Sequence, residues 1–214
     1  MRTEDLIDVL GRSTHPVDRT LVRRRFAMAL LIGGAFAVCV AIALLGTRPD
    51  LAMTARTAGF VAVKVGFGAA IFSLAAFYLM RIARPGGESR ISLVVMAAPF
   101  AVVVAIAAAV MAGAPASHWD RMVVGDEWVE CLLSIPLIAI VPFVAVIWAV
   151  RRAAPTDLAG AGAFAGLVAG SISAMAYALH CTDDSLPFVA VWYGGTIALC
   201  TLAGALSGPR LLKW

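Results

Sequence analysis

The chain alternates between long apolar runs and short polar segments. Six runs carry almost no charge, and each has about the 20 residues that an α-helix needs to cross a bilayer. They occupy residues 26–46, 59–80, 91–113, 128–150, 158–179 and 187–207. Because the runs are continuous rather than alternating, they predict helices and not the strands of a barrel. We expect an all-α polytopic membrane protein with six transmembrane helices.

The composition supports this class and excludes an ordinary soluble domain. Hydrophobic residues make up 62% of the chain and charged residues 14%, whereas soluble domains have about 45–50% and about 25%. The mean hydropathy is +0.93. We divide the chain into an N-terminal polar segment, a transmembrane domain and a short tail, at residues 1–25, 26–208 and 209–214. No cleavage-site pattern follows the first run, so we expect it to be kept as a span.

The basic residues lie mostly on one side of the predicted membrane. With the N-terminus inside, most of the 17 lysines and arginines fall in the inner segments, which predicts that both termini are cytoplasmic. The outer loops are acidic in balance, so the net charge of +4 reflects an inner surface facing membrane lipid. It is no evidence for direct nucleic-acid binding. The predicted location is a bacterial inner (cytoplasmic) membrane, as a multi-pass protein.

Small residues mark the predicted packing faces between helices. Gly162, Gly166 and Gly170 recur at every fourth position of the fifth run, a spacing that lets helix backbones approach closely. We favour packing inside one bundle. A homodimer through the same three glycines is the alternative.

Ionisable chemistry within the runs is nearly absent. Lys64 is the one clear intramembrane charge, and we expect it to snorkel to the outer interface, with a pair to Asp50 or Glu130 as the alternative. The chain has no H-E-x-x-H, no P-loop and no G-x-S-x-G in a strand–helix setting. We therefore expect a helical scaffold with no enzyme activity and no obligatory cofactor.

Two of the four cysteines are predicted to lie together at the outer face. Cys131 lies in the first turn of the fourth run, and Cys181 lies in the loop before the sixth. Cys39 and Cys200 fall within runs, where a free thiol acts as a small apolar group. Thiolate, imidazole and carboxylate groups together suit zinc, copper or cadmium. The candidate metal ligands are Cys131, Cys181, His180, Glu130 and His118.

Several interpretations of the outer cysteine pair remain open. The pair could form a structural disulfide, be two unrelated thiols, or be a reactive or metal-responsive pair. The chain has no C-x-x-C motif, so the spacing does not decide. A structural disulfide alone leaves the acidic and imidazole neighbours of the thiols unexplained. Those acids attract a cation, but they also raise a thiol pKa, which slows oxidation.

The N-terminal segment begins with the pattern of a short amphipathic helix. Thr3 is a suitable N-cap, and Leu6, Ile7 and Leu10 form one apolar stripe. Such a helix is marginal alone and either lies on the inner leaflet or docks in a groove of a partner. Its acidic residues disfavour an anionic leaflet, so we expect a protein partner.

These features together resemble the NrsF family of bacterial inner-membrane anti-sigma factors, which regulate an extracytoplasmic-function sigma factor negatively. The resemblance rests on six spans, on Cys131 and Cys181 in two periplasmic regions, and on T-x-x-L-I-x-x-L followed by P-V-x-R. It implies that these cysteines receive the signal, a transiently bound heavy metal or an oxidant. It also implies that the N-terminal segment binds the sigma factor, through Leu6, Ile7, Leu10, Pro16, Val17 and Arg19.

The chain departs from the larger anti-sigma class, which has a soluble domain often carrying H-x-x-x-C-x-x-C. A short segment must therefore bind the sigma factor here, with the inner loops 81–90 and 151–156 as possible helpers. A small membrane transporter or metal exporter is the rival function, but it requires a polar path through the spans. A quinone-linked thiol oxidoreductase is a second rival, and it lacks its C-x-x-C pair.

Overall fold

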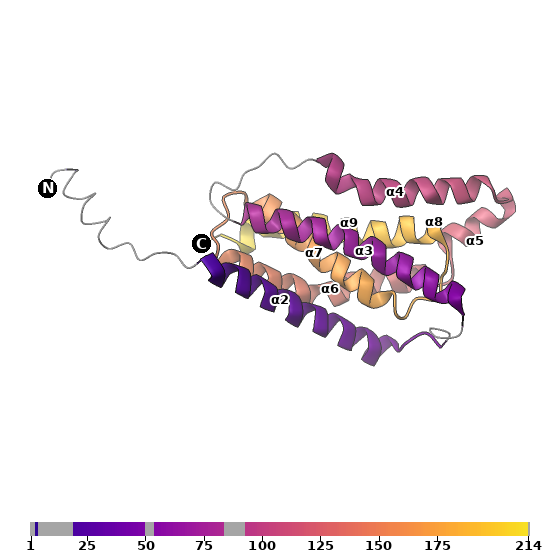
Figure 1. Ribbon diagram of the computed structural model, residues 1–214, viewed down its shortest axis with the longest axis horizontal. Helices are drawn as coiled ribbons and strands as arrows, with labels where there is room; N and C mark the ends of the chain where they lie inside the picture. The colour runs from indigo at the N-terminus through magenta and orange to yellow at the C-terminus, as the bar shows by residue number, and fades with distance from the viewer. Residues whose placement is uncertain (1–2, 4–18, 50–53, 84–92, 214) are drawn as a thin grey trace.

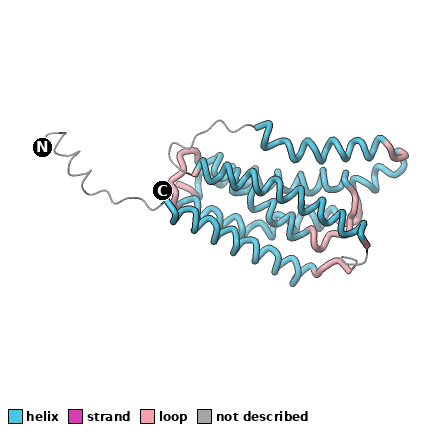
Figure 2. The backbone as a smooth tube through the Cα atoms, in the orientation of Figure 1, coloured by secondary structure: helices cyan, strands magenta, loops and turns pink. Residues whose placement is uncertain are grey.

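Every regular element of the computed structural model is a helix, within the part of the chain that it describes (Figures 1 and 2). The described residues are Thr3, 19–49, 54–83 and 93–213. The elements are α2 (Arg19–Val40), η1 (Ala41–Leu45), α3 (Ala55–Ile82), α4 (Leu93–Ala112), η2 (Ala116–His118), α5 (Trp119–Val124), α6 (Trp128–Arg151), α7 (Leu158–Tyr177), α8 (Leu186–Phe188), η3 (Val189–Tyr193) and α9 (Gly194–Leu211). The short elements η1 and η3 are π-helical turns that continue α2 and lead into α9.

The described helices confirm the all-α class and the six spans. Within these residues, six helical stretches are long and apolar enough to cross a membrane. They are Thr20–Leu45, Ala55–Ile82, Val94–Ala112, Ala116–Arg151, Leu158–Tyr177 and Leu186–Leu211. Each overlaps one predicted run, because length and apolar composition are local properties of the sequence. The sidedness of the two termini stays a prediction.

The last helix continues past its predicted end. Pro209 lies inside α9, which runs to Leu211, so part of the predicted tail is helical. Leu212 is fully buried, and its backbone N–H donates to the carbonyl oxygen of Gly208 at 2.9 Å. Burial of this side chain stabilises the extra turn despite the proline, which removes only one helical donor near the end.

Helix α7 lies at the centre of the bundle and packs against α3, α6 and α9 (Figure 1). In the apolar 18-residue stretch of α7, 67% of the residues are buried. The corresponding stretch of α4, which lies at the edge of the bundle, has 11% buried. Small side chains along α7 allow this central position, because they let three neighbouring helices approach its backbone.

The glycine face of α7 is covered by α9 of the same chain. A Cβ atom added to Gly166 would overlap the carbonyl oxygen of Cys200, and one added to Gly162 would overlap that of Gly204. Gly170 lies against Cys200 as well, with the added Cβ 3.0 Å from the cysteine Cβ. The glycines therefore pack within one bundle, as we favoured. The homodimer interpretation loses its surface, since a second copy would have to displace α9.

We predict that Gly166→Ala destabilises the protein, because its methyl group has no space between α7 and α9. Overpacking of this kind typically costs about 1–3 kcal/mol. Thermal unfolding of the purified protein in detergent measures the loss. Gly34→Ala is the matched control, because nothing lies within 4 Å of the added Cβ at that position in α2. Equal unfolding temperatures for the two variants would contradict the packing.

Candidate functional site

The segment between α7 and α8, residues 178–185, forms a loop that we name the Cys181 loop. It lies at the end of the bundle opposite the start of α2 (Figure 1). Cys181 in this loop and Cys131 in the first turn of α6 are both 0% exposed. They are free thiols and belong to one buried cluster, and Glu127, one turn before Cys131, accepts the N–H of Thr182, the residue after Cys181. The structure thus brings the two predicted cysteines together.

An ion-pair cluster joins the Cys181 loop to two other parts of the chain. The guanidinium of Arg48 donates to both carboxylate oxygens of Asp184, with N–O distances of 3.0 and 2.9 Å. The ammonium of Lys64 donates to the same carboxylate at 3.2 Å. Arg48 lies just beyond η1, and Lys64 lies in α3. One carboxylate therefore connects the loop to the segment after α2 and to α3.

The snorkelling predicted for Lys64 is wrong. Its side chain is 0% exposed, and its ammonium donates to the carbonyl oxygen of Cys181 at 3.0 Å and contacts the Cys181 Sγ at 3.5 Å. With Asp184, these acceptors match the three hydrogens of an ammonium group. The ion-pair partner that the structure describes is Asp184, which was not considered from the sequence. Glu130 lies instead near His180, and Asp50 lies outside the described residues.

At Asp184 and at Cys181, burial and the neighbouring cations shift the pKa in opposite directions. Burial disfavours ionised Asp184, but its bonds with Arg48 and Lys64 outweigh this and hold the pKa of its carboxyl below the usual range. The pairs therefore add stability above the ordinary carboxyl pKa, and this stability is lost as the pH falls through the lowered one. Burial raises the pKa of the Cys181 thiol, and Lys64 offsets part of the rise. At neutral pH Cys181 is therefore a thiol.

The acidic neighbours of the cysteines bind the backbone. Asp183 accepts the N–H groups of Asp126 and Glu127, at 3.1 and 2.8 Å, beside the start of α6. Glu127 in turn accepts from the Thr182 hydroxyl and N–H, at 2.7 and 3.0 Å. Gly125, at φ +62°, permits this contact, because a Cβ there would overlap the Asp183 carboxylate. These acids attach the Cys181 loop to the helix that carries the other thiol.

The five predicted metal ligands do not form one cluster. His180 lies 3.6 Å from Glu130 through Nε2 and 3.2 Å from the carbonyl oxygen of Gly46 through Nδ1, while His118 lies exposed in η2. Across the described ranges, no group of three or more histidine, cysteine, aspartate or glutamate side chains is placed to hold a metal ion. The described residues thus leave the two thiols as the neighbouring soft ligands.

Two tyrosines border the thiols, and the sequence reading missed both. The rings of Tyr177 and Tyr193 lie 6.0 Å apart, and both side chains are fully buried. Tyr193 also faces Lys64, whose ammonium lies 6.0 Å from the ring centre. The local sequence does not indicate a role for these residues, because a tyrosine in an apolar helix is usually a packing residue.

The predicted partner-binding residues fall mostly outside the described residues. This applies to Leu6, Ile7, Leu10, Pro16 and Val17. Arg19 is the first residue of α2. The predicted segment therefore leads directly into the first membrane-spanning helix.

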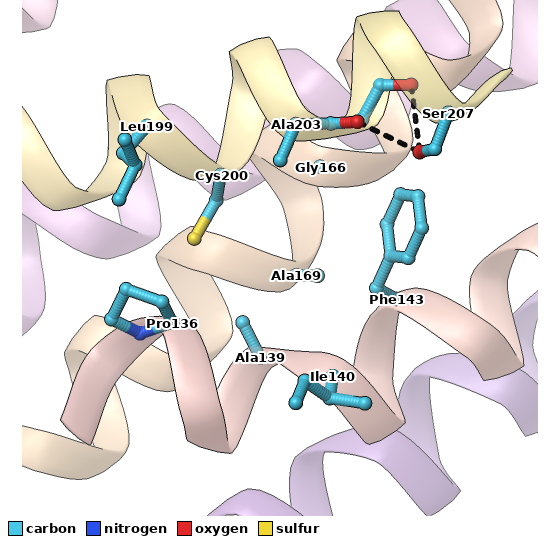
Figure 3. Close-up of a pocket in the computed structure, with 11 residues that line it drawn as sticks. Pro136, Ala139, Ile140, Phe143, Gly166, Ala169, Leu199, Cys200, Ala203 and Ser207 are labelled. Carbon is cyan, nitrogen blue, oxygen red and sulfur yellow. Dashed lines mark hydrogen bonds between the residues drawn. The ribbon is translucent and has the colours of Figure 1, made fainter. Parts of the chain in front are cut away.

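A groove of about 260 Å³ between α6, α7 and α9 offers little chemistry (Figure 3). Its lining is apolar except for Ser207, whose hydroxyl donates to the carbonyl oxygen of Ala203 at 2.7 Å in its own helix. Cys200 also lines it and packs against Gly170. The groove suits apolar chains and offers no reactive cluster. The cysteine pair, with its charged and polar neighbours, is therefore the candidate functional site.

Comparisons with known proteins show the family of the chain. A family model described as NrsF, negative regulator of sigma F, matches residues 10–214. The chain is 33% identical over 214 residues to the probable anti-sigma-F factor NrsF of Azospira oryzae, with 100% of both chains covered. It is 31% identical over 225 residues to the anti-sigma-F factor NrsF of Caulobacter vibrioides, again with 100% of both covered. No solved structure matches it. The chain therefore belongs to the NrsF family of negative regulators of sigma F.

Proposed function

We propose that this protein holds an extracytoplasmic-function sigma factor at the bacterial inner membrane and releases it under heavy-metal or oxidative stress. Residues 1–25 bind the sigma factor in the cytoplasm, and Cys131 and Cys181 receive the signal in the periplasm. Family membership supports the anti-sigma role. The observation that carries the finer proposal is the bonding of the Cys181 loop to Arg48 and Lys64.

The bonds of the Cys181 loop supply a route from the thiols to the sigma-binding segment. Arg48 donates to the Cys181 carbonyl oxygen at 3.1 Å, and its backbone N–H donates to Leu179 at 3.1 Å. Arg48 follows the helical stretch Arg19–Leu45, whose first residues, 19–25, belong to the proposed sigma-binding segment. At 1.5 Å per residue this stretch is about 40 Å long. A displaced Cys181 loop would therefore move the far end of α2.

The distribution of charges supports the sidedness that this mechanism requires. The start of α2 and the end of α9 lie at the same end of the bundle, and the Cys181 loop lies at the other (Figure 1). Arg23, Arg24, Arg25 and Arg210 lie at the first end. The positive-inside rule supports a cytoplasmic location for that end and a periplasmic location for the thiols.

Cys131 and Cys181 would together hold a soft metal ion. The two buried thiols would then become thiolates, each with a strong bond to the metal. Moving a two-state switch from 1:99 to 99:1 needs about 5.5 kcal/mol. Metal–thiolate bonds can supply this free energy, whereas a disulfide typically contributes about 2–4 kcal/mol. Metal capture is therefore sufficient by itself, and oxidation suffices only if the resting state is weakly favoured.

The rival transporter function has less support from the spans. The buried hydroxyls of Ser171, Ser173 and Thr196 donate to carbonyl oxygens of their own helices at 2.7 to 2.9 Å. The buried Lys64 is held in an ion pair near the end of the bundle. These groups are used for structure, and they do not line a polar path.

We predict that Cys131→Ser or Cys181→Ser reduces stress induction of sigma-dependent transcription to the uninduced level, because a site with one thiol cannot bridge two elements. A reporter gene in cells exposed to cadmium measures this, with membrane fractionation to verify insertion. Cys39→Ser and Cys200→Ser are matched controls, because these cysteines lie in α2 and α9 away from the pair. Unchanged induction in both variants of the pair removes the sensor role.

We predict that deletion of residues 1–18 abolishes capture of the sigma factor. This deletion leaves α2 whole, since the helix begins at Arg19, so membrane insertion should persist. Co-purification from detergent extracts measures capture, and Leu6→Asp with Ile7→Asp tests the apolar stripe without changing the length. Retained sigma factor would show that the inner loops suffice.

We predict that Asp184→Asn raises sigma-dependent transcription without stress, because it breaks the bonds that hold the Cys181 loop to Arg48 and Lys64. Removing one partner of a buried pair costs about 3–5 kcal/mol, which is most of the about 5.5 kcal/mol that a full switch needs. Lys64→Met should act in the same direction. Asp120→Asn, at an exposed position in α5, is the control. Basal transcription that stays low in both variants, at normal protein levels, contradicts the route.

A further inference from the structure

Two buried tyrosine hydroxyls beside the thiol pair lack hydrogen-bond partners. Among the described residues, the side-chain oxygens of Tyr177 and Tyr193 are the buried side-chain polar atoms without a partner. The Tyr193 hydroxyl adjoins the Cys181 thiol but does not reach hydrogen-bond geometry with it. The ring of Tyr177 lies 6.0 Å from that of Tyr193, and its backbone carbonyl oxygen accepts the N–H of Cys181 at 3.1 Å. Both hydroxyls therefore belong to the surroundings of the two sulfurs.

An unsatisfied buried hydroxyl is costly, and folded proteins contain few of them. Phenylalanine fills the same space without this cost. Two such hydroxyls at one site therefore indicate that an acceptor appears there in another state of the protein. The two cysteine sulfurs are the groups nearby whose acceptor strength can change.

A neutral thiol is a weak hydrogen-bond acceptor, whereas an anionic acceptor makes bonds about twice as strong as neutral ones. When a metal ion binds, each S–H bond breaks, its proton passes to solvent, and a sulfur–metal bond forms without any oxidation. The thiolate sulfur can then accept the phenolic hydrogens. The Lys64 ammonium, 3.5 Å from the Cys181 Sγ, is a further donor already in place.

We propose that Tyr177 and Tyr193 are positioning residues of a soft-metal site, in which their hydroxyls donate to the metal-bound thiolates of Cys131 and Cys181. This proposal rests on the sensor function proposed above and names the groups that make the pair a metal site. Two thiolates neutralise a divalent ion, so the buried site gains no net charge on binding. Within the described residues no third ligand side chain completes a metal-binding group with the two thiols, so outer hydrogen bonds would carry much of the affinity.

The test is a titration of the full-length protein in detergent with cadmium(II), followed by the thiolate-to-cadmium charge-transfer absorbance. Loss of an outer hydrogen bond to a metal ligand typically weakens binding by about 10- to 100-fold. We expect losses of that size for Tyr177→Phe and for Tyr193→Phe. We also expect the metal-free variants to unfold at the same temperature as the unchanged protein or higher, because each loses an unsatisfied hydroxyl.

Tyr78→Phe is the matched control. Tyr78 lies in α3, 14 residues beyond Lys64 and about 21 Å along the helix, and its ring packs on Phe164. Its loss should leave cadmium affinity unchanged. A double variant, Cys131→Ser with Cys181→Ser, sets the absorbance expected without the thiols.

Three results overturn the proposal. Cadmium affinity could be unchanged in both tyrosine variants, or the metal-free variants could lose stability in step with affinity, as purely structural tyrosines would. The unchanged protein could also take up no cadmium through its thiols. None of these results decides the sensor function, which is tested separately by the transcription reporter in the cysteine variants.

Discussion

The bundle depends, at its Cys181 end, on one carboxylate held against two buried cations. An ammonium that is 0% exposed is stable only when its charge is paired and its hydrogens are bonded, and Asp184 meets the first need for Lys64. Arg48 shares the same carboxylate through two parallel bonds, which fixes the orientation of both groups. Asp184 thereby holds together three segments that are far apart in the sequence, and Cys181 lies among them.

Two other acids of this end, Asp183 and Glu127, hold the Cys181 loop from its other side. Asp183 and Glu127 attach the Cys181 loop to the start of α6 through four backbone and side-chain bonds. Beside them, the hydroxyls of Tyr177 and Tyr193 are buried without a hydrogen-bond partner among the described residues. A frame with satisfied polar groups and a centre with unsatisfied ones is the arrangement expected of a site that changes state on binding.

The packing of the other helices bears on how the proposed change at the thiols would reach the sigma-binding segment. Close backbone contacts between Gly162, Gly166 and α9 make α7 and α9 a tightly packed unit that resists deformation. The segment after α2 is instead bonded to the Cys181 loop by Arg48 and by the contact between Gly46 and His180. In the proposed mechanism, α2 moves relative to this unit and carries the change to the sigma-binding segment.

The sequence by itself determined the six helices, their approximate bounds and the placement of both cysteines at one end, because apolar length and the number of spans settle these locally. It also marked the glycine face of α7. Tertiary structure decided which helix covers that face, that Lys64 is buried against Asp184, and that Asp183 binds backbone N–H groups. It alone placed Tyr177 and Tyr193 beside the thiols. The physical reason is that a polar group's partner depends on which loops meet in space, and Lys64 and Asp184 are 120 residues apart.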